Sequence, residues 1–142
     1  MATRRPGVGI GAVIFRGDEV LIIRRGKPPR EGQWSIPGGR QEWGETVAEA
    51  AAREVMEETA VHCRIRGLVD VVDGIGRDAE GAIEYHYTLV DMWGDWLAGE
   101  PVAGDDAAAA CWMPTEAALE AVIWPETRRV IRAAQALMLR QL

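Results

Sequence analysis

The alternation of apolar and polar positions along the chain predicts short β-strands, interrupted by one helix and followed by two more. Strands are expected where β-branched and other apolar residues form short runs bounded by turn residues. These runs cover residues 8–15, 20–24, 62–72, 82–92 and 111–113. Helices are expected over residues 47–59, 114–122 and 125–142. Because strict β-α-β repetition is missing, the pattern predicts an α/β fold in which helices sandwich a mixed β-sheet.

The helix at residues 47–59 carries the clearest local signals. Thr46 and Glu49 form a capping box, in which the threonine hydroxyl accepts from an early N–H group and the glutamate reaches back to the cap. The segment is rich in Ala, Glu and Met and contains neither Gly nor Pro. At 100° per residue, Glu54 and Glu58 lie on the side of the small apolar residues.

Three carboxylates project from one face of this helix, because Glu54, Glu57 and Glu58 are spaced i, i+3, i+4. Like charges at this spacing repel, and a half-buried carboxylate is costly unless it is paired or bound to a metal. Ligands that offer only oxygen favour a hard divalent cation such as Mg²⁺ or Mn²⁺. The alternative is a solvated acidic helix face, which we rank below the metal site because the acids share the apolar side.

Length and charge limit the classes of protein to consider. Residues 1–142 are expected to form a single domain. A net charge of −6 argues against binding to nucleic acids or anionic membranes, and an acidic protein that handles phosphates is expected to need a divalent cation. No apolar run is long enough to span a membrane, and residues 8–15 are expected to be a strand rather than a signal peptide. Cys63 and Cys111 form no CxxC pair, which fits a cytoplasmic location.

A spaced set of glycine, glutamate, arginine and valine residues lies between positions 39 and 61. Its members are Gly39, Glu45, Arg53, Glu54, Val55, Glu57, Glu58 and Val61. The set resembles the Nudix box, G-x5-E-x7-R-E-U-x-E-E-x-G-U with U apolar, and departs from it only at the last glycine, which is Ala60 here. That glycine suits a left-handed helix cap, which alanine adopts at a cost of about 1 kcal/mol. Pro37, Gly38 and the order of the strands extend the resemblance to the Nudix fold over essentially the whole chain.

The resemblance implies an enzyme, a divalent-metal-dependent hydrolase that cleaves the pyrophosphate linkage of a nucleoside diphosphate joined to another group. Glu57 and Glu58 are expected to bind the metal, which would activate the attacking water. The resemblance further implies that Glu54 is another ligand or the general base, and that the backbone carbonyl of Gly38 is a ligand.

Two further residues of the box are expected to orient these ligands. Arg53 is implied to hold Glu54 by a charge-assisted hydrogen bond, and Glu45 to support the same network from the loop before the helix. The alternative for Arg53 is a surface ion pair with Glu49, four residues earlier.

Many members of this family bring another acid to the site from a loop beyond the box. Asp106 is the candidate for an additional metal ligand here, with its neighbour Asp105 as an equal choice. Weaker candidates are Glu80, Glu84 and Glu100. The alternative for the two aspartates is a solvated turn.

Substrate contacts are expected from the segment before the helix. The candidates are Arg24, Arg25, Trp34, Gly38 and Gly39, with Lys27 and Arg30 as further cations. A glycine lets the pyrophosphate approach closely, whereas the alternative for the cations is a solvated loop. Stacking on a base is considered for Trp34, Tyr85, Tyr87 and Trp93, for each of which packing in the core is the stronger expectation.

The linked groups are recognised outside the box, so the sequence encodes the substrate only weakly. The first expectation is ADP-ribose or a similar nucleotide sugar, because residues 84–91 look like a strand of small bacterial ADP-ribose hydrolases. The alternative is a (d)NTP pyrophosphohydrolase that cleans the nucleotide pool. A non-catalytic nucleotide-sensing module ranks lower, because the box carboxylates are all present. The expected partner is a small nucleotide, and the apolar strands permit a homodimer without specifying one.

Overall fold

The computed structural model describes residues 4–142, which form one mixed sheet and three helices. The strands are β1 (Gly7–Arg16), β2 (Glu19–Arg25), β3 (Trp34–Ser35), β4 (Gly38–Arg40), β5 (His62–Arg77), β6 (Ile83–Ala98) and β7 (Ala107–Pro114). The helices are α1 (Val47–Thr59), α2 (Thr115–Ala121) and α3 (Pro125–Leu139). Because β1 and β6 pair in parallel and the other pairs are antiparallel, the predicted mixed sheet is confirmed.

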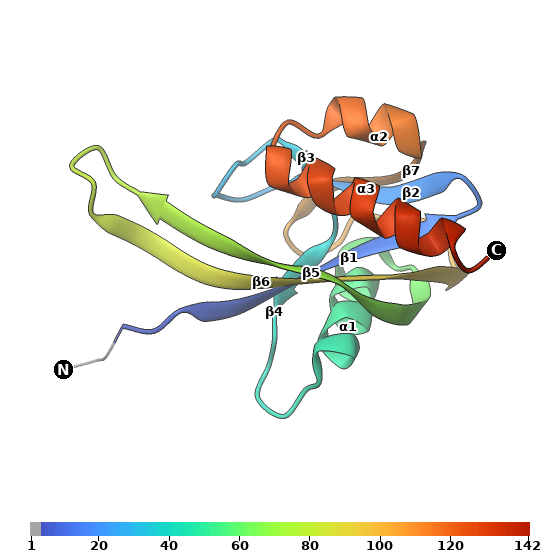
Figure 1. Cartoon of the computed structure of the whole chain (residues 1–142), viewed down its shortest axis with the longest axis horizontal. Helices are drawn as coiled ribbons and strands as arrows, with labels where there is room; N and C mark the ends of the chain where they lie inside the picture. Colours follow the sequence, from blue (N-terminus) through green and yellow to red (C-terminus); the bar gives the residue numbers. More distant parts are fainter. Residues whose placement is uncertain (1–3) are drawn as a thin grey trace.

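Helices cover both faces of the sheet, with α1 on one side and α2 and α3 on the other (Figure 1). Alternate residues of β1 therefore enter two different hydrophobic cores: Val13 packs with Ile131 of α3, and Ile14 packs with Val55 of α1. Burial on both faces explains why β1 and β2 are continuous apolar runs rather than alternating ones. Within residues 4–142, no helix combines the length and apolar character needed to cross a membrane.

The two ends of α1 are as the sequence predicts. The Thr46 hydroxyl accepts from the backbone N–H of Glu49, and the Glu49 carboxylate accepts from the backbone N–H of Thr46. Ala60 ends the helix in the left-handed conformation, with φ 61°, and its N–H donates to the Met56 carbonyl. Alanine thus takes the strained conformation for which the family motif has glycine.

The hairpin of β5 and β6 is longer than predicted and extends beyond the helices (Figure 1). Residues 73–81 were expected to be a loop, yet β5 continues to Arg77. Gly76 pairs with Tyr85, and the tyrosine ring lies in the space that a side chain at position 76 would fill. Cross-strand aromatic packing thus supports a glycine-containing strand that local propensity alone would not predict.

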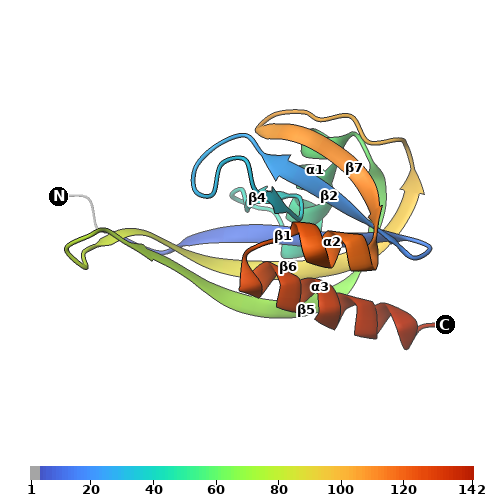
Figure 2. The same ribbon diagram turned by 90° about the horizontal axis from the view of Figure 1, so that it is seen from above.

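Strand β1 changes its neighbour along its length. Its end pairs with β2 through Phe15 and Arg16 only, and its beginning pairs with β4 through residues 9–11. Beyond the two shared pairs, β2 continues with β7 and β3 as a separate wing of the sheet (Figure 2). The divergence of the two wings leaves room for a cleft between them, lined by Gly9 and Gly11 on β1 and by Ile23 and Arg25 on β2.

Candidate active site

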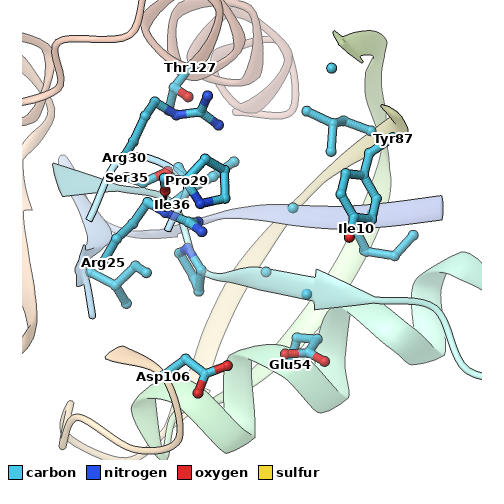
Figure 3. A pocket seen from close by; sticks show the side chains of 18 of the residues that line it. Ile10, Arg25, Pro29, Arg30, Ser35, Ile36, Glu54, Tyr87, Asp106 and Thr127 are labelled. Carbon is cyan, nitrogen blue, oxygen red and sulfur yellow. Dashed lines mark hydrogen bonds between the residues drawn. The ribbon is translucent and has the colours of Figure 1, made fainter. Parts of the chain in front are cut away.

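A cleft of about 930 Å³ lies between the two wings of the sheet and opens beside α1. This volume is in the range of pockets that hold small organic ligands. Among the residues named from the sequence, those that line it are Arg25, Lys27, Arg30, Gly38, Gly39, Glu54, Glu57, Glu58, Tyr85, Tyr87, Asp105 and Asp106. Figure 3 shows Glu54 and Asp106 on one side of the cleft and Arg30 and Thr127 on the other.

Arg53 is the centre of a hydrogen-bond network behind the cleft. Its Nε donates to Glu45 Oε2 at 2.6 Å and its Nη2 to Glu45 Oε1 at 3.0 Å, a two-pronged ion pair that fixes the guanidinium plane. Its Nη1 donates to Glu54 Oε1 at 2.8 Å and to Glu57 Oε2 at 3.1 Å. The alternative pairing with Glu49 is not observed, since the Glu49 carboxylate caps the helix.

Two of the partners of Arg53, Glu45 and Glu54, differ in their electrostatics. The hydrogen bonds from Arg53 lower the pKa of Glu45, with a smaller contribution from the backbone N–H of Glu42. Burial raises the pKa of Glu54, and the bond to Arg53 only partly offsets this effect. The Glu54 carboxylate therefore faces the cleft in a poorly solvated position, where its pKa is moved toward that of a usable proton acceptor.

Glu58 is more deeply buried than Glu54, with 6% of its surface exposed. Its Oε1 accepts from the backbone N–H of Gly38 at 2.6 Å. Burial raises the pKa of Glu58 to about 7, and the nearby Glu54 adds to the shift. The helix thus holds two carboxylates whose charge is not fully compensated, as the sequence argument expects of a cation site.

Among residues 4–142, no three acidic, histidine or cysteine side chains converge closely enough to form a ready metal cluster. The hydrogen bonds account for this arrangement, because Glu54 and Glu57 turn toward Arg53 while Glu58 turns toward Gly38. The donors are all hard oxygens on one wall of the cleft, and burial opposes the charge of two of them. This donor set fits a divalent cation of the Mg²⁺ type.

The loop between β6 and β7 is attached to the end of α1. The Val102 N–H donates to the Thr59 carbonyl and the Gly104 N–H to the Glu58 carbonyl, both at 2.9 Å. These bonds place Asp106 on the cleft wall, where its carboxylate forms an ion pair with Lys27 at 2.8 Å.

The weaker acid candidates do not line the cleft. They are Glu80, Glu84 and Glu100, and Glu100 instead forms an ion pair with Arg16.

Some substrate-binding candidates lie elsewhere. Arg24 is exposed and does not line the cleft, because successive residues of β2 point to opposite faces and Arg25 takes the inward position. Trp34 and Trp93 pack against the hydrophobic core that contains α3, and neither lines the cleft. The site also contains residues that the sequence did not indicate, namely Ile36, Asp91, Trp124 and Thr127. An acid within the apolar run at residues 89–93 is the one signal that would have suggested Asp91.

Comparisons with known proteins agree with this architecture. The model of the NUDIX domain family matches residues 5–134. A Methanocaldococcus jannaschii protein named ADP-ribose pyrophosphatase is 36% identical over 105 residues, which are 74% of this chain and 60% of that protein, so the chain spans less than two thirds of that relative. A Mycolicibacterium smegmatis protein named 8-oxo-(d)GTP phosphatase is 32% identical over 118 residues, 80% of this chain and 33% of that protein. The crystal structure of a Burkholderia pseudomallei MutT NUDIX hydrolase superposes with a TM-score of 0.75 at 30% identity, covering 92% of this chain and 98% of that one.

Proposed function

The chain belongs to the Nudix family, and from that premise we propose that it hydrolyses the pyrophosphate linkage of a nucleoside diphosphate joined to another group. One observation carries the proposal. The guanidinium of Arg53 is fixed by Glu45 and holds Glu54 on the wall of a cleft that also contains Glu57 and Glu58. A positioned carboxylate in such a cleft is what water attack on phosphorus requires.

We propose Mg²⁺ or Mn²⁺ as the cofactor, held by Glu57, Glu58 and Glu54 together with the Gly38 carbonyl and Asp106. When bound, the cation neutralises phosphate oxygens and lowers the pKa of the attacking water. The lowered solvation of Glu54 and Glu58 supports this assignment, because a cation offsets the cost of two half-buried carboxylates.

The chain's own residues supply the remaining parts of the mechanism. Glu54 accepts a proton from the attacking water or serves as a further ligand, and Arg53 sets its orientation through the 2.8 Å bond. Arg25 and Arg30 place positive charge on the opposite side of the cleft from α1, where phosphate oxygens of the substrate would lie, whereas the charge of Lys27 is paired with Asp106. A side chain at position 38 would meet the backbone of β1 and one at position 39 would meet the Glu54 carboxylate, so the two glycines let β4 lie close to both.

For the substrate we propose ADP-ribose or a similar nucleotide sugar first. The similarity to the archaeal protein named ADP-ribose pyrophosphatase supports this choice. The second candidate is an oxidised or ordinary (d)NTP, which the similarity to the mycobacterial 8-oxo-(d)GTP phosphatase favours. Both candidates contain a nucleoside diphosphate joined to a further group, so they share the proposed chemistry.

The proposal is tested by measuring product release from ADP-ribose, other nucleoside diphosphate sugars, dinucleoside polyphosphates and (d)NTPs, with and without Mg²⁺ or Mn²⁺. We expect metal-dependent hydrolysis of one class, and a loss of about 100-fold or more in kcat for Glu57→Gln and Glu58→Gln. Glu120→Gln is the matched control, since Glu120 is exposed on α2 and does not line the cleft. Near-normal rates in both box variants would contradict the metal assignment, and a folded, metal-binding protein without turnover would indicate the sensing role.

A further inference from the structure

Two buried polar side chains in the cleft have no partner. Five polar or charged side chains are buried among residues 4–142, namely Glu58, Thr59, Asp91, Thr115 and Thr127. Three of them are hydrogen-bonded to backbone groups: Glu58, Thr59 and Thr115. The side chains of Asp91 and Thr127 form no hydrogen bond within this part of the chain, and both line the cleft. Among residues 4–142 the one side-chain polar atom that is fully buried without a partner is Trp112 Nε1, so the polar atoms of Asp91 and Thr127 are open to the cleft and can meet a ligand there.

Asp91 is kept unpartnered by its surroundings. It lies on β6 opposite Gly11 of β1, with 8% of its surface exposed, and its carboxylate fills the space that the missing side chain of Gly11 leaves. The positive charge of Arg129 acts on it, but the two terminal nitrogens of Arg129 bind Asp70 at 2.7 Å and Glu126 at 2.9 Å. Burial raises the pKa of Asp91 to about 6, with Asp70 adding to the shift. The carboxylate is therefore both buried and available.

The walls around Asp91 and Thr127 combine aliphatic and aromatic surface with a few charged groups, among them Glu126 and Arg30. Ile36, Val72 and Leu89 contribute aliphatic surface, and Trp124 lies under the guanidinium of Arg30 at 3.9 Å. A pocket with aliphatic and aromatic walls and several polar groups suits a flat ring that has apolar faces and a polar edge.

We propose that Asp91 determines base specificity by accepting a hydrogen bond from an amino group on the purine of the substrate, with the Thr127 hydroxyl contacting the same edge. An ionised carboxylate can only accept hydrogen bonds, so the edge that it recognises must donate one. The 6-amino group of adenine and the 2-amino group of guanine share this chemistry. A hypoxanthine base has an oxygen in place of the first and a hydrogen in place of the second. Its ring N1–H is the one donor left on this edge, so the carboxylate loses the bond from the amino group. The inference rests on the proposed function for the identity of the substrate class.

The test compares substrate pairs that differ in one amino group: ADP-ribose with its inosine counterpart, and dGTP with dITP. We expect the wild-type protein to prefer the amino member of whichever pair it hydrolyses by about tenfold or more in kcat/KM. Asp91→Ala should bring that ratio close to one, and Asp91→Asn should lower or invert it because an amide can donate to the oxo base. Asp95→Asn is the matched control, since Asp95 lies on the same strand as Asp91 but does not line the cleft.

Binding measurements separate failure of this inference from failure of the proposed function. AMP against IMP, and GMP against IMP, are titrated calorimetrically with wild-type protein and both Asp91 variants. A preference for AMP or GMP that is lost in the variants supports the role of Asp91 even if no substrate is hydrolysed. If the preference for the amino base over hypoxanthine is unchanged in the variants, in hydrolysis or in binding, the proposed role of Asp91 is overturned. A change that affects only the discrimination between different linked sugars overturns it as well.

Thermal unfolding without ligand distinguishes a purely structural role of Asp91 from a role in base recognition. Because Asp91 is unpartnered, Asp91→Asn should raise the Tm of the protein. A lowered Tm, together with an unchanged base preference, would show that the carboxylate serves the fold and would overturn the proposal.

Discussion

The carboxylate of Glu54 lies over the α-carbon of Gly39, in the space that any side chain at position 39 would occupy. Gly39 belongs to β4, the short strand that pairs with the beginning of β1, so its backbone cannot easily move away. The glycine of the box therefore has a steric reason, which is the close approach of the Glu54 carboxylate to the strand.

Gly39→Ala should displace Glu54 and lower kcat/KM by about 100-fold, since a misplacement of about 1 Å is enough for such a loss. The fold should persist, because the carboxylate is the flexible end of a side chain. Steady-state kinetics with circular dichroism would check both points. Gly67→Ala is the control, because a side chain there meets only Trp93 at an ordinary contact distance. Equal rates in the two variants would contradict the steric argument.

Arg53→Lys should reduce kcat strongly, by about 100-fold, and change KM little. Lysine keeps the charge but cannot bind Glu45 through two parallel bonds while also holding Glu54. Arg53 does not line the cleft, so substrate binding itself should be spared. Separate determination of kcat and KM is the measurement, and a variant with raised KM and normal kcat would place Arg53 in contact with substrate instead.

The stability of the protein should depend on pH through Asp91. Its pKa is about 6 in the folded protein against an ordinary value of 3.8, so the folded state binds the proton more tightly than the unfolded state. Asp91 thus lowers the free energy of unfolding as pH rises from about 4 to about 6, by about 3 kcal/mol in total. Urea unfolding across this range should show a smaller fall for Asp91→Asn than for the wild-type protein. Parallel curves would show that Asp91 is not the titrating group.

Ala60→Gly should leave the rate unchanged and raise the free energy of unfolding by up to about 1 kcal/mol. Glycine relieves the left-handed strain at φ 61°, although it also increases the freedom of the unfolded chain. Chemical denaturation of the two proteins measures the difference. A clear loss of stability would show that the Ala60 side chain contributes packing that outweighs its backbone strain.

The sequence predicts the parts of the site that depend on local spacing. The capping box at Thr46 fixes where α1 begins, and the i, i+3, i+4 spacing places Glu54, Glu57 and Glu58 on one face, so both features follow from short segments. The length of the β5–β6 hairpin does not follow from a short segment, because it depends on Tyr85 covering Gly76 from the neighbouring strand. The metal and substrate roles of the box residues stay predictions.

The remainder of the cleft depends on contacts between distant segments. Asp91 and Thr127 lie 36 positions apart on β6 and α3, and their shared lack of partners is visible only once the fold brings them to one cleft. The same holds for Asp106, which reaches the wall through bonds between its loop and the end of α1. The sequence also does not decide which of the neighbours Arg24 and Arg25 faces the cleft, because a shift of one residue in strand register exchanges the two faces.

The attachment of the β6–β7 loop to the last carbonyls of α1 has a consequence for local unfolding. The bonds from Val102 and Gly104 occupy backbone acceptors that a helix end normally leaves to water. Opening of the loop and fraying of the helix end should therefore occur as one cooperative event, with similar hydrogen-exchange protection at both places. The loop that contains Asp106 and the helix end that contains Glu58 should then unfold and refold together. Asp106 and Glu58 would therefore leave the cleft wall, and return to it, at the same time.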